Sequence, residues 1–120
     1  LELHPFRQPV ELSLLSVLPP IHPNWGLGAL AAESLQARER RNAHLFLAST
    51  ANQLKRMGYS VRSEAVIGTP TEKILEQALG QRADLILMGS RGRYGVLRLV
   101  LGSVSHALLH SAPCPVLVFN

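Results

Sequence analysis

A glycine-bearing segment near the C-terminal end carries the clearest chemical signal in the sequence. Gly89 and Gly92 follow the apolar run ADLILM directly, and Gly102 comes after nine further residues. Glycines in such a turn permit positive φ angles and let the backbone approach a ligand closely. Successive backbone N–H groups in a turn also form a concave site for anions. The segment therefore predicts an anion-binding loop.

The residues after this loop favour phosphate as the anion. We expect Gly102 and Ser103 to open a helix over residues 103–111, and a helix N-terminus offers free N–H groups and a positive dipole end. The hydroxyls of Ser103 and Ser105 could donate further hydrogen bonds. Positive charge comes from three nearby arginines, Arg91, Arg93 and Arg98. An ordinary strand-to-helix connection has a similar pattern, so the residues alone leave both readings open.

Apolar runs separated by Gly and Pro predict the elements that position this loop. Strands are expected at 10–18, 60–67, 83–88 and 116–119, with helices over about 27–57, 70–80 and 103–111. This alternation predicts an α/β fold with an open parallel sheet, helices on both faces and right-handed crossovers. In such sheets ligands bind beyond the carboxyl ends of the strands, which is where the glycine loop falls.

Local signals predict where the helices end and which side the first one buries. Gly58 should stop the first helix and Gly80 the second. Thr69 should be the N-cap of the second helix, with Pro70 at its first position and Glu72 completing a capping box. Residues at helical spacing predict the buried stripe of the first helix: Ala43, Leu47, Thr50, Leu54 and Met57.

The glycine spacing resembles the G-x2-G-x9-G-S/T pattern of the ATP-binding universal stress proteins. The segment ADLILMGSRGRYGVLRLVLGSVSHALLHSAPCPVLVF is similar to that family almost throughout, as are LLSVLPP and the Gly-Thr-Pro at residues 68–70. The resemblance covers about residues 9–119. It implies a Rossmann-like sheet of five parallel strands in the order 3-2-1-4-5, usually in a homodimer, and a regulatory, nucleotide-binding role in stress response. The Walker A and GxGxxG patterns are absent.

The resemblance also implies a set of nucleotide-binding residues. Gly89 and Gly92 would approach the phosphates and ribose, and Arg91 would lie against the nucleotide. Val17 and Met88 would line the ribose or adenine pocket. The start of the following helix would receive the phosphates through Gly102, Ser103, Val104 and Ser105. ATP is the expected ligand, with Mg²⁺ or Mn²⁺ held mainly by its phosphates, because the loop has no acidic residue nearby in the sequence.

The first ten residues do not resemble the strand and helix with which the family begins. In the family sheet that strand is central, between the strands expected at 10–18 and 83–88, and its end faces the adenine. A gap there would leave backbone groups unpaired. We therefore expect residues 1–120 to form a single universal-stress-protein-like domain that lacks its first strand and most of its first helix.

Three classes of function compete for this sequence. The first is a regulatory ATP-binding protein with little or no turnover, since the loop shows no general base or water-positioning group. The second is an interaction module of the same fold that binds no nucleotide. The third, a nucleotide transferase of similar topology, would need a base or nucleophile facing the loop, and the sequence shows none.

The composition limits which binding partners and which cellular compartment are expected for this chain. The net charge is +4, but the basic residues are spread out and only 5% of residues are aromatic, so we expect no nucleic-acid surface. No apolar run reaches the roughly 18 residues that span a bilayer, so no membrane partner is expected. One cysteine, Cys114, excludes an intrachain disulfide and fits a cytoplasmic location.

Two further segments near the C-terminal end contain residues that could form a metal site or a subunit contact. His106, His110 and Cys114 recur every four residues, a spacing that can place zinc ligands on one helix face. Pro113 interrupts the helix before Cys114 and no fourth ligand is evident, so we expect surface or packing histidines and no metal. The last strand is short and apolar, and we expect it to form the homodimer contact through Val116, Leu117, Val118 and Phe119.

Overall fold

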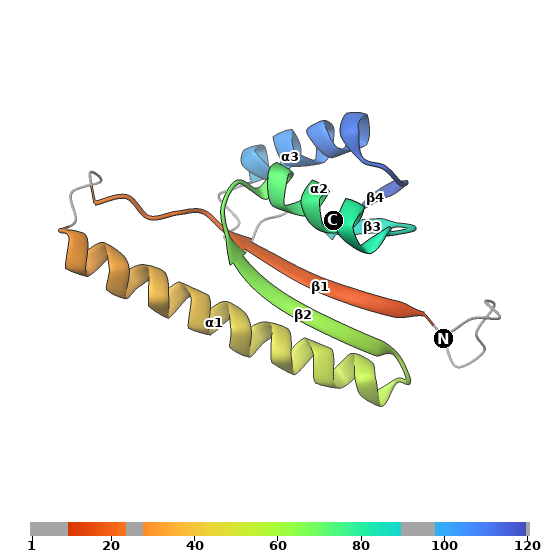
Figure 1. The fold of residues 1–120 in the computed structure, drawn as a ribbon, viewed down its shortest axis with the longest axis horizontal. Helices are drawn as coiled ribbons and strands as arrows, with labels where there is room; N and C mark the ends of the chain where they lie inside the picture. Colours follow the sequence, from red (N-terminus) through yellow and green to blue (C-terminus); the bar gives the residue numbers. More distant parts are fainter. Residues whose placement is uncertain (1–9, 24–27, 90–97, 120) are drawn as a thin grey trace. The chain divides into compact units, whose positions relative to one another are not determined.

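The computed structural model describes residues 10–23, 28–89 and 98–119, with backbone alone at 98–102 and 119. Helices and strands alternate along these residues (Figure 1): β1 (Glu11–Leu18), α1 (Ala29–Arg56), β2 (Ser60–Ile67), α2 (Pro70–Gln81), β3 (Ile86–Gly89), α3 (Arg98–Ser111) and β4 (Val116–Phe119). The chain divides into two compact units, Leu1–Gly68 and Thr69–Asn120, which are described separately below as unit 1 and unit 2.

Unit 1 consists of a parallel strand pair with one long helix packed along it. β1 and β2 run in register from Glu11↔Ser60 to Leu18↔Ile67, and Figure 1 shows α1 lying alongside them. The core forms where small residues let the helix approach the strands, and its buried members are Leu18, Ala43, Leu47 and Ala65. Helical spacing on α1 and period-two alternation on β1 direct these side chains to the same interface.

Unit 2 consists of a second parallel pair with two helices. β3 and β4 run in register from Ile86↔Val116 to Gly89↔Phe119, and Ile86 donates its N–H to the carbonyl of Pro115 at 3.0 Å. α3 contacts both α2 and β4. Leu108 on α3 is completely buried, and Val104, one turn earlier on the same face, is nearly so. This face of α3 is therefore the centre of the unit 2 core.

The predicted α/β class with parallel strands is confirmed. The strand at 60–67 lies beside the strand at 10–18, and β3 lies beside β4, as the order 3-2-1-4-5 requires. Within the described residues the strands form two pairs, with no hydrogen-bonded ladder between β1 and β3. The absence of a central strand between them stays a prediction. No helix in the described part of the chain is long and apolar enough to cross a bilayer.

Several predicted boundaries and burials are wrong. β3 begins at Ile86 and not at residue 83, because Ala83 donates its N–H to the carbonyl of Ala78 and so completes the end of α2. This strand is also not buried throughout, since Leu87 is 58% exposed. The stripe predicted on α1 fails at its last position, because Met57 is half-exposed.

The capping chemistry of α2 also differs from the prediction. Thr69 is the N-cap and Pro70 the first helical residue, but the Thr69 side chain makes no capping hydrogen bond, so no capping box forms. Gly80 lies inside the helix. Arg82 takes the left-handed conformation, with φ 52° and ψ 51°, and ends it. The prediction that Gly58 stops the first helix is confirmed, since α1 ends at Arg56 and Gly58 follows with a φ of 99°.

Truncating Leu108 should destabilise the protein far more than truncating its neighbour. Leu108→Ala removes a fully buried side chain and leaves a cavity, which should lower the free energy of unfolding by about 2–5 kcal/mol. Leu109→Ala is the matched control, since Leu109 is 60% exposed on the same helix and should change stability by less than about 0.5 kcal/mol. Urea denaturation measures both. Equal losses in the two variants would show that α3 is packed by a different face.

Candidate functional site

The predicted loop leaves β3 at the edge where ligands bind in parallel sheets. Gly89 is the last residue of β3 and lies opposite Phe119 in the ladder, while the half-buried Met88 lies opposite Val118. Because β3 and β4 are parallel, their carboxyl ends meet at one edge of the pair. The strand residues of the predicted site therefore lie at the edge that the rule for open α/β sheets requires.

Two predicted site residues fall outside the part of the chain that the structure describes. Arg91 and Gly92 belong to residues 90–97, between the end of β3 and the start of α3. Their roles stay predictions.

The helix after the loop is longer than predicted. α3 begins at Arg98, so Gly102 is its fifth residue and Ser103 its sixth, and neither opens the helix. In an α-helix the first four N–H groups lack an intrahelical acceptor, which here are those of residues 98–101. The predicted phosphate donors at the helix start therefore shift by about one turn towards the loop. After Arg98, the apolar residues Leu99, Val100 and Leu101 continue the helical pattern up to Gly102, a continuation that the glycine signal at position 102 obscured.

The three predicted site residues after Gly102 differ in exposure. Ser103 is exposed, whereas Val104 and Ser105 are 6% and 8% exposed. The side chains of Val104 and Ser105 thus belong to the interior of unit 2. A hydroxyl contact to a bound phosphate is therefore open to Ser103 but not to Ser105 in this conformation.

Val17, the predicted site residue in unit 1, lies next to the end of β1. It alternates with the buried Leu18, so it is on the face of the strand pair opposite α1.

The segment after the strand is tied to α1 by Gln36. Ile21 donates its N–H to the Gln36 side-chain oxygen at 2.7 Å, and the Gln36 amide donates to the carbonyl of Pro19 at 3.4 Å. These bonds fix how the chain leaves β1.

The carboxylate next to β3 in the sequence lies at the other end of the strand from the predicted anion site. Asp84 precedes β3 and so lies at its amino end, away from Gly89. In the described residues no group of three or more His, Cys, Asp or Glu side chains could hold a metal ion. The predicted site residues bear no carboxylate or imidazole, so they can bind an anion but offer no group for general acid–base catalysis.

The structure brings two histidines of α3 into contact. His106 and His110 are both exposed, and their rings meet edge to face with centroids 4.6 Å apart. Their spacing of four residues is the signal that the sequence carries for this pair, and their exposure agrees with the expectation of surface histidines. Cys114 lies beyond the helix end at Ser111.

Comparison with known proteins gives a consistent result. Residues 7–120 match the profile of the Universal stress protein family. Universal stress protein Sll1388 of Synechocystis is 30% identical over 92% of this chain and 72% of its own length. Universal stress protein MJ0531 of Methanocaldococcus jannaschii is 43% identical over 51% of this chain, and a universal stress protein of Thermus aquaticus is 49% identical over 48% of it. These two matches span only 36% and 43% of those relatives' lengths.

The fold is shared with a solved structure. The structure of hypothetical protein MJ0577 superimposes with a TM-score of 0.78, covering 99% of this chain and 82% of that one, at 24% sequence identity. The likeness establishes the fold, and the sequence matches establish the kinship. Taken with the parallel strand pairs and the glycine spacing after β3, they show that this chain belongs to the universal stress protein family.

Proposed function

We propose that this protein binds ATP at the carboxyl end of β3 and acts as a nucleotide-responsive regulator in stress response. The observation that carries the proposal is the position of Gly89. It ends a parallel strand at the edge where ligands bind, and the chain returns from there into the start of α3. The triphosphate would lie between that strand end and the first turn of the helix.

Backbone donors supply most of the recognition in this proposal. The first turn of α3 has four N–H groups without an intrahelical acceptor, and its dipole favours negative charge by about 0.3–1 kcal/mol per charge. These donors are held by the helix and need no side-chain ordering. Ser103, exposed one turn later, can add a hydroxyl.

The position of Gly102 inside α3 also supports phosphate binding at the start of this helix. A glycine inside a helix destabilises it by about 1 kcal/mol relative to alanine, and Gly102 is the fifth residue of α3. A residue without a side chain at this point leaves room for a phosphate group beside the helix. A bound phosphate at this point would explain why the fifth residue of α3 is a glycine.

The chemistry available at the site favours binding over turnover. None of the predicted contact residues can activate water, so we propose slow hydrolysis at most. Mg²⁺ or Mn²⁺ would be held through the phosphate oxygens, since both ions prefer oxygen ligands and commonly bind through nucleotide phosphates. The stress-response role rests on the names of the relatives, each called a universal stress protein. A cytoplasmic location stays a prediction.

Gly102→Ala should abolish ATP binding without destabilising the fold. The new methyl group would occupy the space proposed for phosphate, and affinity should fall about ten-fold or more, or at least 1.4 kcal/mol. Gly80→Ala is the matched control, because Gly80 also lies inside a helix and its added Cβ would meet nothing within 4 Å. Both alanines should hold or raise stability by up to about 1 kcal/mol. Calorimetric titration of ATP and thermal unfolding of the full-length protein measure the two effects.

The opposite outcome would favour the interaction module. If Gly102→Ala and Gly92→Ala both bind ATP as the parent does, the glycines serve only the turn and helix. If Gly80→Ala reduced ATP affinity as much as Gly102→Ala, the loss could not be attributed to a methyl group at the phosphate site. That result would also contradict the proposal.

Arg91→Ala should weaken ATP binding less than either glycine variant. Salt screens the charge of a side chain that reaches into solvent, whereas the backbone N–H groups of a helix are fixed in place. The difference in affinity between Arg91→Ala and the parent should shrink as NaCl rises from about 0.05 to 0.5 M, because the Debye length shortens over that range. A loss equal to that of Gly102→Ala at every salt concentration would show that the side chain, and not the backbone, holds the phosphates.

We further propose that β4 pairs with β4 of a second copy to form a homodimer. Ile86 donates to the carbonyl of Pro115, so in this parallel register the N–H groups of Val116 and Val118 are directed to the other edge of β4. Within the described residues β4 pairs only with β3, which leaves that edge available. An edge strand of this kind readily pairs with another chain.

Val118→Pro should convert the dimer to a monomer. Proline removes the outward N–H but leaves the ladder to β3 intact, and edge strands tolerate it. Val118→Thr keeps both the N–H and the branched side chain and serves as the control. Sedimentation velocity at micromolar concentration should show a monomer for the first variant and a dimer for the second. A parent protein that sediments as a monomer would contradict the proposal directly.

A further inference from the structure

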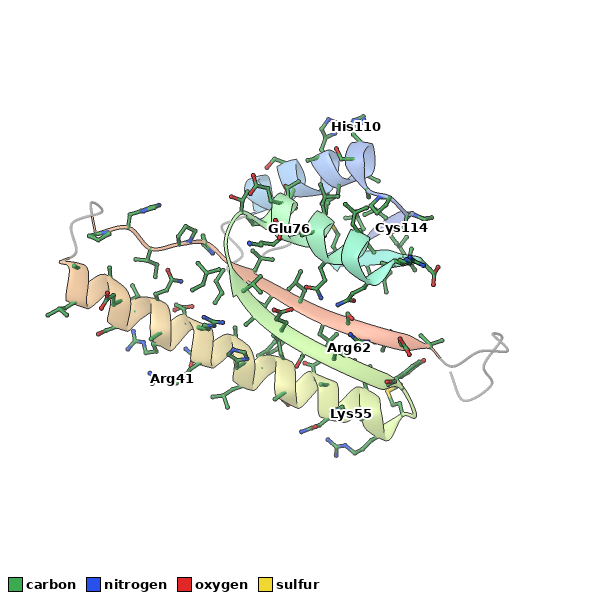
Figure 2. All side chains as sticks on the ribbon, viewed as in Figure 1. Arg41, Lys55, Arg62, Glu76, His110 and Cys114 are labelled. Atoms are coloured by element: carbon green, nitrogen blue, oxygen red, sulfur yellow. The ribbon has the colours of Figure 1, made fainter. Side chains whose placement is uncertain are left out.

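His106 and His110 form an isolated pair of imidazoles on the exposed side of α3. They are one turn apart, and their ring centroids lie 4.6 Å from each other at an interplanar angle of 75°. Both are exposed, whereas Val104 and Leu108 face the core from the opposite side of the helix. Figure 2 labels His110 on α3, with its side chain directed away from α2. From this pairing we propose that His106 and His110 together chelate one divalent transition-metal ion.

The spacing of the rings suits a shared metal ion. Tetrahedral Zn²⁺ binds imidazole nitrogens at about 2.0–2.1 Å, which places two such nitrogens about 3.3 Å apart. Side chains four residues apart on a helix have Cβ atoms about 5–6 Å from each other, and two histidines at this spacing bind zinc in other helices. The observed edge-to-face contact becomes a chelate when the rings turn about χ2, a torsion with broad preferences. Because both rings are exposed, this rotation disturbs no core packing.

Two protein ligands define the character of the site. Cys114 lies in the connection between α3 and β4, as Figure 2 shows, and does not join the histidines in a three-ligand group within the described residues. Water would occupy the remaining coordination positions. The site is therefore open and exchangeable, and weaker than a closed structural zinc site with four ligands.

The imidazoles also fix the class of metal. Nitrogen ligands of this kind suit Zn²⁺, Ni²⁺ and Cu²⁺, with Cu²⁺ bound most tightly, whereas Mg²⁺ prefers oxygen. This site is thus separate in chemistry from the ion that would accompany ATP. The proposal departs from the expectation of no metal at these histidines, because the structure brings the two rings together on one exposed face.

Calorimetric titration of ZnCl₂ into the untagged full-length protein tests the proposal. His106→Gln and His110→Gln should each weaken the tightest Zn²⁺ binding about ten-fold or more, because each removes the intramolecular second ligand. His44→Gln is the matched control, since His44 is also exposed on a helix but belongs to α1. It should leave the affinity unchanged. MgCl₂ should give no heat that depends on His106 or His110.

The results of these titrations either support or overturn the proposed chelate. Zn²⁺ binding that falls in both α3 variants, with circular dichroism unchanged, supports the chelate. A parent protein that does not bind Zn²⁺ overturns it. So does a parent-like affinity in either α3 variant, or an equal loss in His44→Gln, because the metal would then be held elsewhere.

Discussion

The parallel pairing of β3 with β4 is the constraint on which the account of the site depends. Two parallel neighbours cannot be joined by a tight turn, so the chain must cross over, and α3 is that crossover. The crossover makes the helix start near the end where β3 stops. Gly89 and the first turn of α3 are therefore assigned to the same end of the unit by topology, whatever the intervening residues do. An anion site at this end requires no further element of the fold.

The same helix has three different tasks along its length. Its first turn offers unpaired N–H groups, its inner face holds the core through Leu108, and its outer face bears the two histidines. These tasks are compatible because residues three or four apart share one face of a helix, while the residues between them lie on other faces. Val104 and Ser105 illustrate the separation. Both were predicted to receive phosphate together with Gly102 and Ser103, yet their side chains are buried and contribute to packing.

The sequence predicted those parts of the fold that depend on hydrophobic pattern. β2 and β4 have the predicted limits and β1 nearly so, because apolar runs bounded by Gly and Pro carry a strong strand signal. The helix ends were predicted less well. Gly80 and Gly102 suggested boundaries but lie inside helices, and Arg82 takes a left-handed conformation that its residue type disfavours. Helix limits depend on tertiary packing as well as on intrinsic preference, and a single glycine is a weak guide.

Backbone amide chemical shifts on addition of ATP to the full-length protein test most directly whether ATP binds at the carboxyl end of β3. We predict the largest shifts at Gly89, Gly92 and residues 98–103. Amides at the opposite end of the same elements, such as those of Asp84 and Ser111, should change little. Saturable shifts confined to the amino ends of the strands, or no saturable shifts at millimolar ATP, would contradict the account.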